Sequence, residues 1–594
     1  MEQFAAPSIQ QMAFDAVALA LDHGVLGYRI PAALASLLLL LVSLFGPGAK
    51  HQDAAAPSRR SDFFYLLVLA TFLLALRWPV LALGDLEGDE SVAVSAALTR
   101  YLDPAFGVRL FTGSAGPLLT YPVAAVGLFG IRIDYGAAKL ISLLLTMGSS
   151  ALLYLALRTL GEARTARVAM LPLLFFLGMS NTGWTLSYCS EQWINLLVIS
   201  MIYCLLRLGQ RIGREGANLC AIGLALGLIP LVKWQGMPMA ALAAAWAAVI
   251  VARRRLREGA GLGRLAAGLL PLAVLGLAPI LAWCVILWSV GSLGFFYQTY
   301  FSGLFTQATS RFSTTMVQRM MALPEWGITP YPMARLFLAM TVLFWVPAVI
   351  LLCFVRRPRR PSLDLALAAL YLVVSVYAVL QPGGGFAHYM NLLLLPYCLL
   401  LMLVCCRLAE AAARPALVLV AYLGLTVFLP SIAYLRDVPL PVRFPPTAVR
   451  AMSLDALRAL RVPGSPMIQW GWVYAYYVLT GMTWGTRTGG GHEILEPFFP
   501  DKTVFVADFV ENLESGRAPV FLDTALEGAP SYPNRELYGH ERVPEIADAV
   551  RRNYFRCAEF PGARLYLHRQ RYLARAAIRS WCAGLPDWNP PPPP

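Results

Sequence analysis

The chain has 594 residues, of which 58% are hydrophobic and only 14% are charged, and its mean hydropathy is +0.60. These values exclude an ordinary soluble globular protein and indicate a polytopic membrane protein. The net charge of +14 comes from short basic clusters between apolar runs, as in the cytoplasmic loops of membrane proteins. The charge therefore reflects topology, and we expect no nucleic-acid partner.

Apolar runs of about 16–25 residues, long enough to cross a bilayer, predict about twelve spans. They lie at 26–46, 63–83, 137–157, 166–184, 187–206, 217–232, 235–252, 266–290, 335–355, 363–381, 389–406 and 415–434. Because arginine-bearing loops follow every second span, the positive-inside rule places those loops in the cytoplasm. The other side then holds the N-terminus, the acidic loop 84–136, the turn at Lys233, the loops 291–334 and 382–388, and all residues after about 435. The first 22 residues lack a basic start, so we expect no cleavable signal peptide.

The stretch GDLEGDES, residues 84–91, places four carboxylates directly after the second predicted span. Charged groups are costly in hydrocarbon, so this loop is expected to lie in water. The sequence that follows, VAVSAALTRYL, has helical periodicity, and acidic residues favour the first turn of a helix. On these residues alone, a solvated acidic helix start and a functional site are both open.

The last part of the chain, residues 436–594, differs in pattern from the predicted membrane domain, residues 1–435. PMIQWGWVYAYYVLTG (466–481) and the segment 501–526 alternate like strands and turns, ERVPEIADAVRRNYF (541–555) is helix-like, and ARLYLHR (563–569) is strand-like. Strand, helix and strand in succession predict a small soluble α/β domain on the non-cytoplasmic side. A proline-rich tail, WNPPPPP, ends the chain.

Most of the ten cysteines lie within predicted spans, where a free thiol behaves as a small apolar group. Cys557 and Cys582 fall in the soluble domain, where an oxidising exterior would allow a disulfide between them. The sequence leaves open whether their separation permits the bond. Since no CxxC or zinc-type spacing occurs, we expect no structural zinc site.

Several short motifs occur in a fixed order along the chain. They are Asp89-Glu90, Gly116-Pro117-Leu118, Leu128-Phe129-Gly130, Lys139 at the start of a span, the arginine-bearing turn 158–167, SYCSEQWINLLV, IPLVKWQGMPMA, GGGFAHYMNLLLLPYCLL and IQWGWVYAYYVLTGMTWGTR. In this order the chain resembles the GT-C superfamily of polyprenyl-phosphate-sugar-dependent glycosyltransferases. That superfamily includes protein O-mannosyltransferases and the aminoarabinose transferase of lipid A. Two departures are Lys139, where arginine is commoner, and the additional span near 26–46.

The resemblance implies a GT-C type membrane enzyme that moves a hexose, a pentose or a related sugar from a polyprenyl-phosphate donor to an acceptor hydroxyl. The acceptor class, whether glycolipid, polysaccharide or protein, stays open. The resemblance also implies the inner membrane of a bacterium, with the C-terminal domain periplasmic. By the same resemblance Asp89 is the catalytic base, and Glu90 positions the acceptor or orients the loop. Asp85 and Glu87 are expected to be solvated or available to a cation.

The departing lipid phosphate needs cations, and Lys233 is the best candidate, because a lone lysine between two apolar runs is costly unless it pairs or binds something. Arg132 and Lys139, beside the chain's re-entry into the membrane, are further candidates for the phosphate. Glu191 is a candidate for hydrogen bonds to sugar hydroxyls or to the phosphate-binding lysine, and His388 is a candidate donor to the phosphate or the acceptor. The structural alternatives are snorkelling to the interface for Lys233 and headgroup contacts for Arg132 and Lys139. For Glu191 the alternative is an ion pair between spans, and for His388 it is a buried structural role.

Glu87 and Asp89 have the acid-x-acid spacing of a site for Mg²⁺, Mn²⁺ or Ca²⁺, but lysine can replace a metal at a monophosphate, so no cofactor is required. Two other classes fit the composition: a secondary transporter with about twelve spans, and a non-enzymatic membrane scaffold. The halves of the chain show no internal repeat, and a transporter has little need of a large outer domain. Both observations favour the enzyme.

Overall fold

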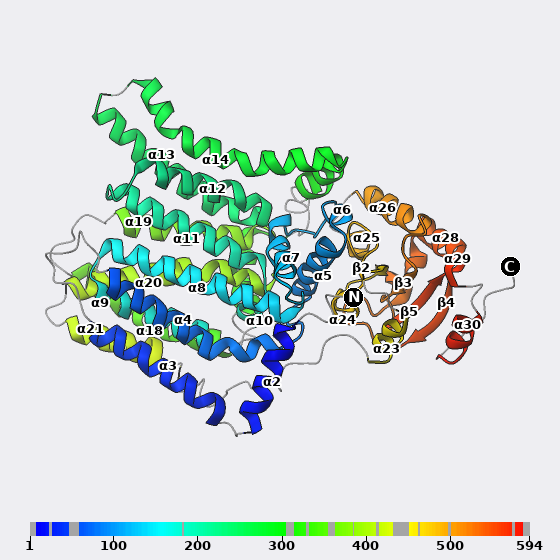
Figure 1. Ribbon diagram of the computed structural model, residues 1–594. Helices are drawn as coiled ribbons and strands as arrows, with labels where there is room; N and C mark the ends of the chain where they lie inside the picture. The colour runs from blue at the N-terminus through cyan, green and yellow to red at the C-terminus, as the bar shows by residue number, and fades with distance from the viewer. Residues whose placement is uncertain are drawn as a thin grey trace.

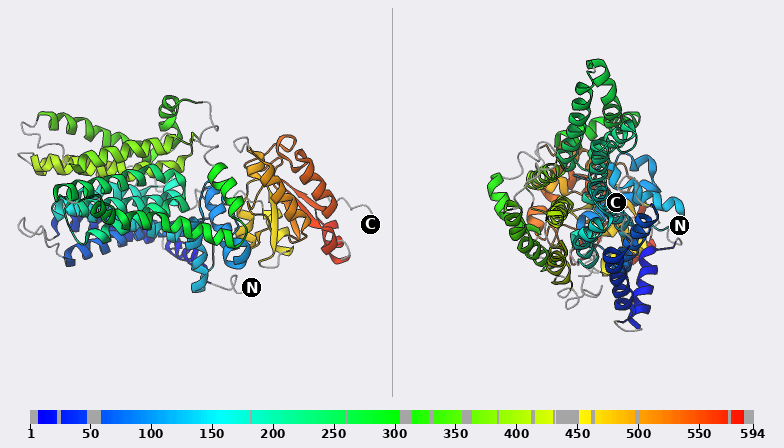
Figure 2. Two further views of the ribbon diagram at one scale, coloured as in Figure 1. Left: turned by 90° about the horizontal axis from the view of Figure 1, so that it is seen from above. Right: turned by 90° about the vertical axis from the view of Figure 1, so that its left-hand side faces the viewer.

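The structure is a computed structural model that describes residues 7–22, 26–46, 59–180, 183–259, 261–303, 314–327, 332–354, 363–383, 385–411, 415–429, 431, 451–460, 464–496, 501–572 and 576–585. A long helical bundle carries a small α/β domain at one end (Figures 1 and 2). The predicted architecture, a helical membrane domain followed by a C-terminal α/β domain, is confirmed. The predicted boundary near residue 435 lies outside the described residues.

Each predicted span falls on a helix of the bundle. These helices are α3 (Leu26–Phe45), α4 (Arg59–Arg77) with the 3₁₀ turn η2 (Trp78–Ala82), α8 (Tyr135–Leu160), α9 (Ala163–Met179), α11 (Ser190–Gly209), α12 (Glu215–Val232), α13 (Met237–Arg257), α14 (Leu262–Ser289), α18 (Pro332–Phe354), α19 (Leu363–Leu380), α20 (Asn391–Ala411) and α21 (Pro415–Leu423) with the π turn η8 (Gly424–Phe428). Within the described residues, seven helical segments are long and apolar enough to cross a membrane, judged by length and composition. The number of spans therefore stays a prediction.

Small residues allow close packing where α12 meets α14. A Cβ placed on Gly227 would lie 2.6 Å from the carbonyl oxygen of Gly276, and one on Gly223 would lie 2.6 Å from that of Leu272. Such close contacts are how helices associate in a membrane, where apolar burial gives little net driving force. On other positions of α14, Leu270 and Leu277 are exposed, as expected for a lipid-facing surface.

Short elements cover the end of the bundle that faces the C-terminal domain. They are α2 (Ile9–Asp22), α5 (Gly88–Leu102), α6 (Pro104–Gly107), η3 (Pro117–Leu119), α7 (Tyr121–Val126), η4 (Gly127–Phe129), α10 (Gly183–Leu186), η5 (Trp234–Gly236), α15 (Leu293–Phe296), η6 (Tyr297–Ser302), α17 (Met316–Gly327) and η7 (Ala387–Met390). The N-terminal helix α2 packs against η2 and the start of α8, where Ser8 donates to Asp134 over 2.5 Å. It therefore forms part of the folded domain.

The C-terminal domain contains a five-stranded sheet in the order β2-β1-β3-β5-β4. Its elements are α23 (Ala451–Leu460), β1 (Pro466–Trp470), α24 (Ala475–Thr480), β2 (Thr483–Trp484), α25 (His492–Leu495), α26 (Thr503–Glu514), β3 (Val520–Asp523), α27 (Arg535–Tyr538), η10 (His540–Arg542), α28 (Pro544–Asn553), β4 (Tyr554–Phe560), β5 (Ala563–His568), α29 (Arg569–Tyr572) and α30 (Ala576–Ala583). β1 is parallel to β2 and β3, and β5 is antiparallel to β3 and β4. Cys557 and Cys582 form a disulfide that ties β4 to α30.

Two segments of this domain differ from the sequence prediction. Residues 475–480 form the helix α24 where strands and turns were expected, and residues 503–514 form the helix α26. α24 connects two parallel neighbours, β1 and β2, and such a connection needs a crossover rather than a tight turn. Aromatic and β-branched residues favour strands only weakly, so this topological requirement prevails in VYAYYVLT.

The helix α5 joins the two domains (Figure 1). Every residue from Glu90 to Arg100 is buried, because the helix packs against both α7 and the C-terminal α24 and β2. The Trp484 indole donates to Ser95 Oγ over 3.0 Å, and the Trp484 main-chain N–H donates to Thr99 Oγ1 over 3.0 Å. The acidic loop is therefore held from both sides.

Candidate active site

The acidic stretch forms the N-terminus of α5. The chain leaves η2, bends at Leu86 and Glu87, and enters the helix at Gly88. Asp89 and Glu90 thus occupy the first helical turn, where the unpaired N–H groups and the helix dipole favour negative charge. The two carboxylates differ in exposure: the side chain of Asp89 is 46% exposed, whereas that of Glu90 is fully buried.

The carboxylate of Asp89 is partly open to solvent beside His388. Its Oδ2 lies 3.6 Å from Nε2 of His388, and it also lies within electrostatic range of Lys233 and of Tyr474 in the C-terminal domain. Both domains therefore border the carboxylate. The side chain of Asp89 is more exposed than those of Glu87 and Glu90, which suits a group that must reach a substrate.

His388 connects two of the acids. It lies on η7 at the outer end of α20, and its Nδ1 is 3.4 Å from Glu87 Oε2 while its Nε2 faces Asp89. The ring stacks on Phe386, with centroids 5.7 Å apart, and meets Tyr389 edge-on. These aromatic contacts fix the plane of the imidazole, so its two nitrogens point at the two carboxylates.

Lys233 and Glu191 form a buried ion pair with 2.6 Å between Nζ and Oε1. Lys233 ends α12 and Glu191 opens α11, so the pair joins the outer ends of two bundle helices. The ammonium also lies 4.6 Å from the centroid of the Tyr389 ring. A lysine has three donors, so the pair with Glu191 leaves N–H groups for another acceptor.

Glu90 and Lys139 form a second buried pair, 2.9 Å apart, with side chains 0% and 1% exposed. The two oxygens of Glu90 also accept the main-chain N–H groups of Leu86 and Tyr188, and Lys139 donates to the carbonyl of Gly84 over 2.7 Å. Both groups are thus fully engaged in holding the acidic stretch against the bundle. Of the two roles foreseen for Glu90, the contacts favour orienting the loop.

Asp85 differs from the expectation of a solvated carboxylate. Its Oδ2 accepts a hydrogen bond from Ser91 over 2.7 Å, and the Ser91 hydroxyl also lies 2.7 Å from the Tyr135 hydroxyl. Oδ1 is buried and finds no hydrogen-bond partner among the residues that the structure describes. Burial, followed by the negative charge of Glu90, raises the pKa of Asp85 to about 7. The expected solvation of Asp85 was wrong because Ser91 on α5 and Tyr135 and Lys139 on α8 lie around this acid, while its availability to a cation stays a prediction.

Arg132, predicted to meet the donor phosphate, lies next to the N-terminal segment. Its main-chain N–H donates to the carbonyl of Pro7 over 3.0 Å, and the side chain is half-buried. Glu87 and Asp89, the predicted cation ligands, both face His388. A phosphate contact by Arg132 and a cation at Glu87 and Asp89 stay predictions.

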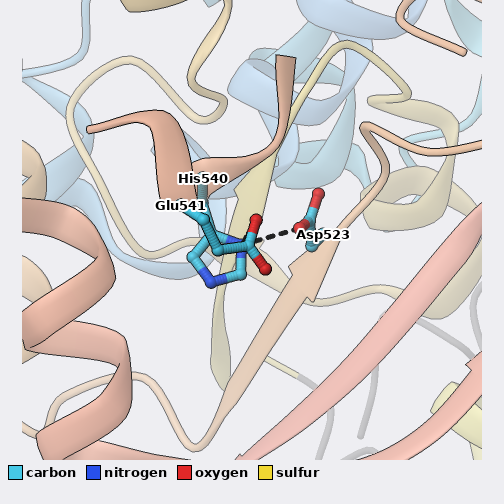
Figure 3. A group of neighbouring side chains, drawn as sticks. All are labelled: Asp523, His540 and Glu541. Carbon is cyan, nitrogen blue, oxygen red and sulfur yellow. Dashed lines mark hydrogen bonds and ion pairs between the residues drawn. The ribbon is translucent and has the colours of Figure 1, made fainter. Parts of the chain in front are cut away.

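Within the described part of the chain, one group of three His, Cys, Asp or Glu side chains has ligand atoms within 4.8 Å of one another: Asp523, His540 and Glu541 (Figure 3). His540 Nδ1 lies 2.7 Å from Asp523 Oδ2, and Arg535 pairs with both carboxylates. Although burial alone would raise it, the pKa of Asp523 is held below its usual value by the His540 hydrogen bond and the nearby positive charges. Arg535 together with Arg564, which lies 3.9 Å from Glu541, already balances the two carboxylates, and these ion pairs connect η10 and α27 to the end of β3.

The C-terminal domain supplies residues that the sequence did not single out. The ring of Trp472 would lie 3.7 Å from a Cβ placed on Gly88, so it packs on the start of α5. Trp472 stacks on His492 with centroids 5.1 Å apart, and His492 Nδ1 lies 3.1 Å from the hydroxyl of Tyr474. The quoted motif IQWGWVYAYY contains Trp472 and Tyr474, but a motif alone does not show which domain they face.

No protein-family model and no curated protein sequence matches the chain. Among solved structures, the chain is similar to ArnT from Cupriavidus metallidurans bound to undecaprenyl phosphate, with 15% sequence identity and a TM-score of 0.47. The similarity covers 85% of this chain and 97% of that chain. The assignment of the site rests on the residues of this chain.

Proposed function

We propose that the chain is an integral membrane glycosyltransferase of the GT-C type. It transfers a sugar, a hexose or a pentose, from a polyprenyl-phosphate donor to an acceptor hydroxyl at the periplasmic face of the bacterial inner membrane. The observation that carries the proposal is the convergence of four separate segments on one cluster. Asp89 on α5, Glu191 on α11, Lys233 after α12 and His388 on η7 meet where the bundle faces the C-terminal domain.

Asp89 is the general base of the proposed reaction. Its carboxylate takes the proton of the acceptor hydroxyl as the hydroxyl oxygen forms a bond with the anomeric carbon of the donor sugar. The bond from that carbon to the phosphate oxygen breaks, and its electron pair stays with the phosphate. The products are the glycosylated acceptor and a free polyprenyl phosphate, so protons and electrons balance without a redox partner.

Lys233 stabilises the negative charge that develops on the leaving phosphate. A preformed cation in a site shielded from water acts more strongly than one that must be drawn from solvent. Glu191 keeps the ammonium in place between reactions, because the pair is buried and 2.6 Å apart. His388 orients Asp89 through the contact with Nε2 while Glu87 holds the other ring nitrogen.

Substitution of Asp89 by Asn tests the proposal. Glycolipids, polysaccharides and glycoproteins of the source cell envelope are compared by mass spectrometry with the wild-type chain, with D89N, and without the chain. We expect one glycan modification to disappear both without the chain and with D89N. D455N, which alters an exposed aspartate on α23, is the matched control and should keep the modification. Normal modification by a well-folded D89N would overturn the proposal.

A further inference from the structure

A dense basic patch occupies the end of the bundle that is remote from the C-terminal domain, where α11 and α13 end and α12 and α14 begin (Figure 1). In the two connections there, residues 207–216 and 253–265, eight arginines face two glutamates, a net charge of +6. The patch consists of Arg207, Arg211, Arg214, Arg253, Arg254, Arg255, Arg257 and Arg264 with Glu215 and Glu258. The proposed reaction uses none of these residues.

Part of the patch is a rigid frame. Arg254 and Arg255 on α13 both pair with Glu215 at the start of α12, over 2.6 and 2.8 Å. Arg254 also donates to the carbonyl of Leu208 near the end of α11 over 2.8 Å. A Cβ on Gly268 of α14 would lie 3.6 Å from Arg255 Nε, so the fourth helix lies beside the same arginines. Four helix ends are thus held together.

Other arginines of the patch are open to solvent. Arg253, Arg257 and Arg264 are exposed, and no ion pair between described residues engages any of the three. Arg253 and Arg257 stand four residues apart on α13, where like charges repel, so an anion bound beside them would be favoured. The one exposed acid beside them, Glu258, pairs with Arg255 over 3.4 Å.

The start of α14 adds hydrogen-bond donors to these charges. No side chain caps the helix at Gly261, so main-chain N–H groups of its first turn remain available beside Arg264. Gly261 and Gly263 have open space where a side chain would stand, which leaves room for a ligand. Arginines together with a helix N-terminus form a phosphate-binding arrangement.

Exposed apolar side chains lie next to the same charges. Leu256 is 64% exposed and Leu262 is 83% exposed, one on each side of the turn between α13 and α14. α14 continues from there with a lipid-facing side that includes Leu270. A ligand bound here thus meets phosphate-binding groups at its head and apolar surface along its tail.

We infer that the end of α13 and the start of α14 form a headgroup site for an anionic phospholipid, with Arg257 and Arg264 as its phosphate-binding side chains. Basic pockets at the ends of membrane helices favour anionic lipid headgroups, and each basic side chain near the surface contributes about 1 kcal/mol. The removal of two arginines should therefore weaken binding about thirtyfold. This inference does not depend on the proposed glycosyl transfer.

Native mass spectrometry of the full chain from mixed micelles of phosphatidylglycerol and phosphatidylcholine tests the inference. We expect the wild type to retain phosphatidylglycerol preferentially, R257Q/R264Q to lose the preference, and R257K/R264K to keep it. R551Q/R552Q removes two exposed arginines from the C-terminal domain and should match the wild type. Thermal unfolding in phosphatidylcholine micelles checks that all variants fold equally well.

Two outcomes would overturn the inference. One is an unchanged preference for phosphatidylglycerol in R257Q/R264Q, which would place lipid binding elsewhere. The other is displacement of the bound lipid by inorganic phosphate at matched concentration, which would show a site for free anions. Retention of phosphatidylglycerol in the presence of inorganic phosphate supports a lipid headgroup site, because acyl-chain contacts then contribute to binding.

Discussion

Lys233 and Glu191 form a buried ion pair that joins the outer ends of α12 and α11, with 2.6 Å between Nζ and Oε1. Burial of two charges is costly, and the pair offsets this cost only while both partners are present. If stability alone mattered, two apolar side chains at these positions would serve as well or better. Their presence beside Asp89 and His388 is therefore better explained by a need for a fixed cation at this position.

Substitution of Glu191 by Gln should destabilise the chain and abolish transfer, because it leaves the ammonium of Lys233 buried without a counter-charge. The expected loss in the free energy of unfolding is about 3–5 kcal/mol. Thermal unfolding in detergent measures it, with E258Q, which alters an exposed pair, as the control. The double variant E191Q/K233M should recover most of the stability but no transfer. Equal stability of E191Q and the wild type would contradict a buried pair.

Substitution of His388 by Phe should lower the rate of transfer about a hundredfold while the chain stays folded, because Phe keeps the ring contacts and removes both nitrogens that face Glu87 and Asp89. The time course of product formation in isolated membranes gives the rate. H388Q keeps a single hydrogen-bonding group and should lie between H388F and the wild type. If both variants react at the wild-type rate, His388 only fills space beside Phe386.

The sequence was sufficient for the helices and for the gathering of the site residues at one end of the bundle, while the side of the membrane stays a prediction. Bilayer thickness sets the length of an apolar run, so every predicted span falls on a helix. The topology was drawn from arginine clusters alone, and it placed Lys233, Glu191 and His388 on the side of Asp89. These residues do lie together, because each comes at the end of its helix that faces the C-terminal domain.

The sequence left the partners within the site open, since a contact of Glu191 with Lys233 was one of two alternatives and the pair of Glu90 with Lys139 was not foreseen. Lys139 pairs with Glu90, while Lys233 pairs with Glu191, and either assignment satisfies the same topology. The choice depends on how α5 packs on α8 and α11 on α12, which involves residues 42 to 49 positions apart in the sequence. The enclosure of Asp85 likewise depends on Ser91 and on a neighbouring helix. No local pattern reports such tertiary contacts.

Asp85 should give the stability of the chain a pH dependence. Its pKa in the folded chain is about 7, and in the unfolded chain it has the ordinary value near 4. Between these values the folded state binds the extra proton, so this carboxylate makes the chain less stable as the pH rises from about 4 to 7. D85N removes that loss and should be more stable than the wild type at about pH 8, with a smaller difference at about pH 5.

Thermal unfolding in detergent across this pH range measures the effect of D85N. D548N, which changes an exposed aspartate on α28, serves as the control and should follow the wild type at every pH. The comparison between variants is needed because Asp508, whose pKa burial raises to about 6, adds its own pH dependence to all of them. A constant stability difference between D85N and the wild type would show that Asp85 titrates normally.

Trp484 should couple the C-terminal domain to α5, the helix that carries Asp89. W484F removes the indole donor to Ser95 and leaves a buried hydroxyl without that partner, at a cost of about 1–3 kcal/mol. Hydrogen exchange of the amides of α5 should become faster, and transfer should slow because Asp89 is held less firmly. W470F is the matched control, since the Trp470 indole donates to the Tyr538 carbonyl within the C-terminal domain. It should lower the stability of that domain but leave exchange in α5 unchanged, whereas equal exchange of α5 in both variants would show that the domain does not support the helix through Trp484.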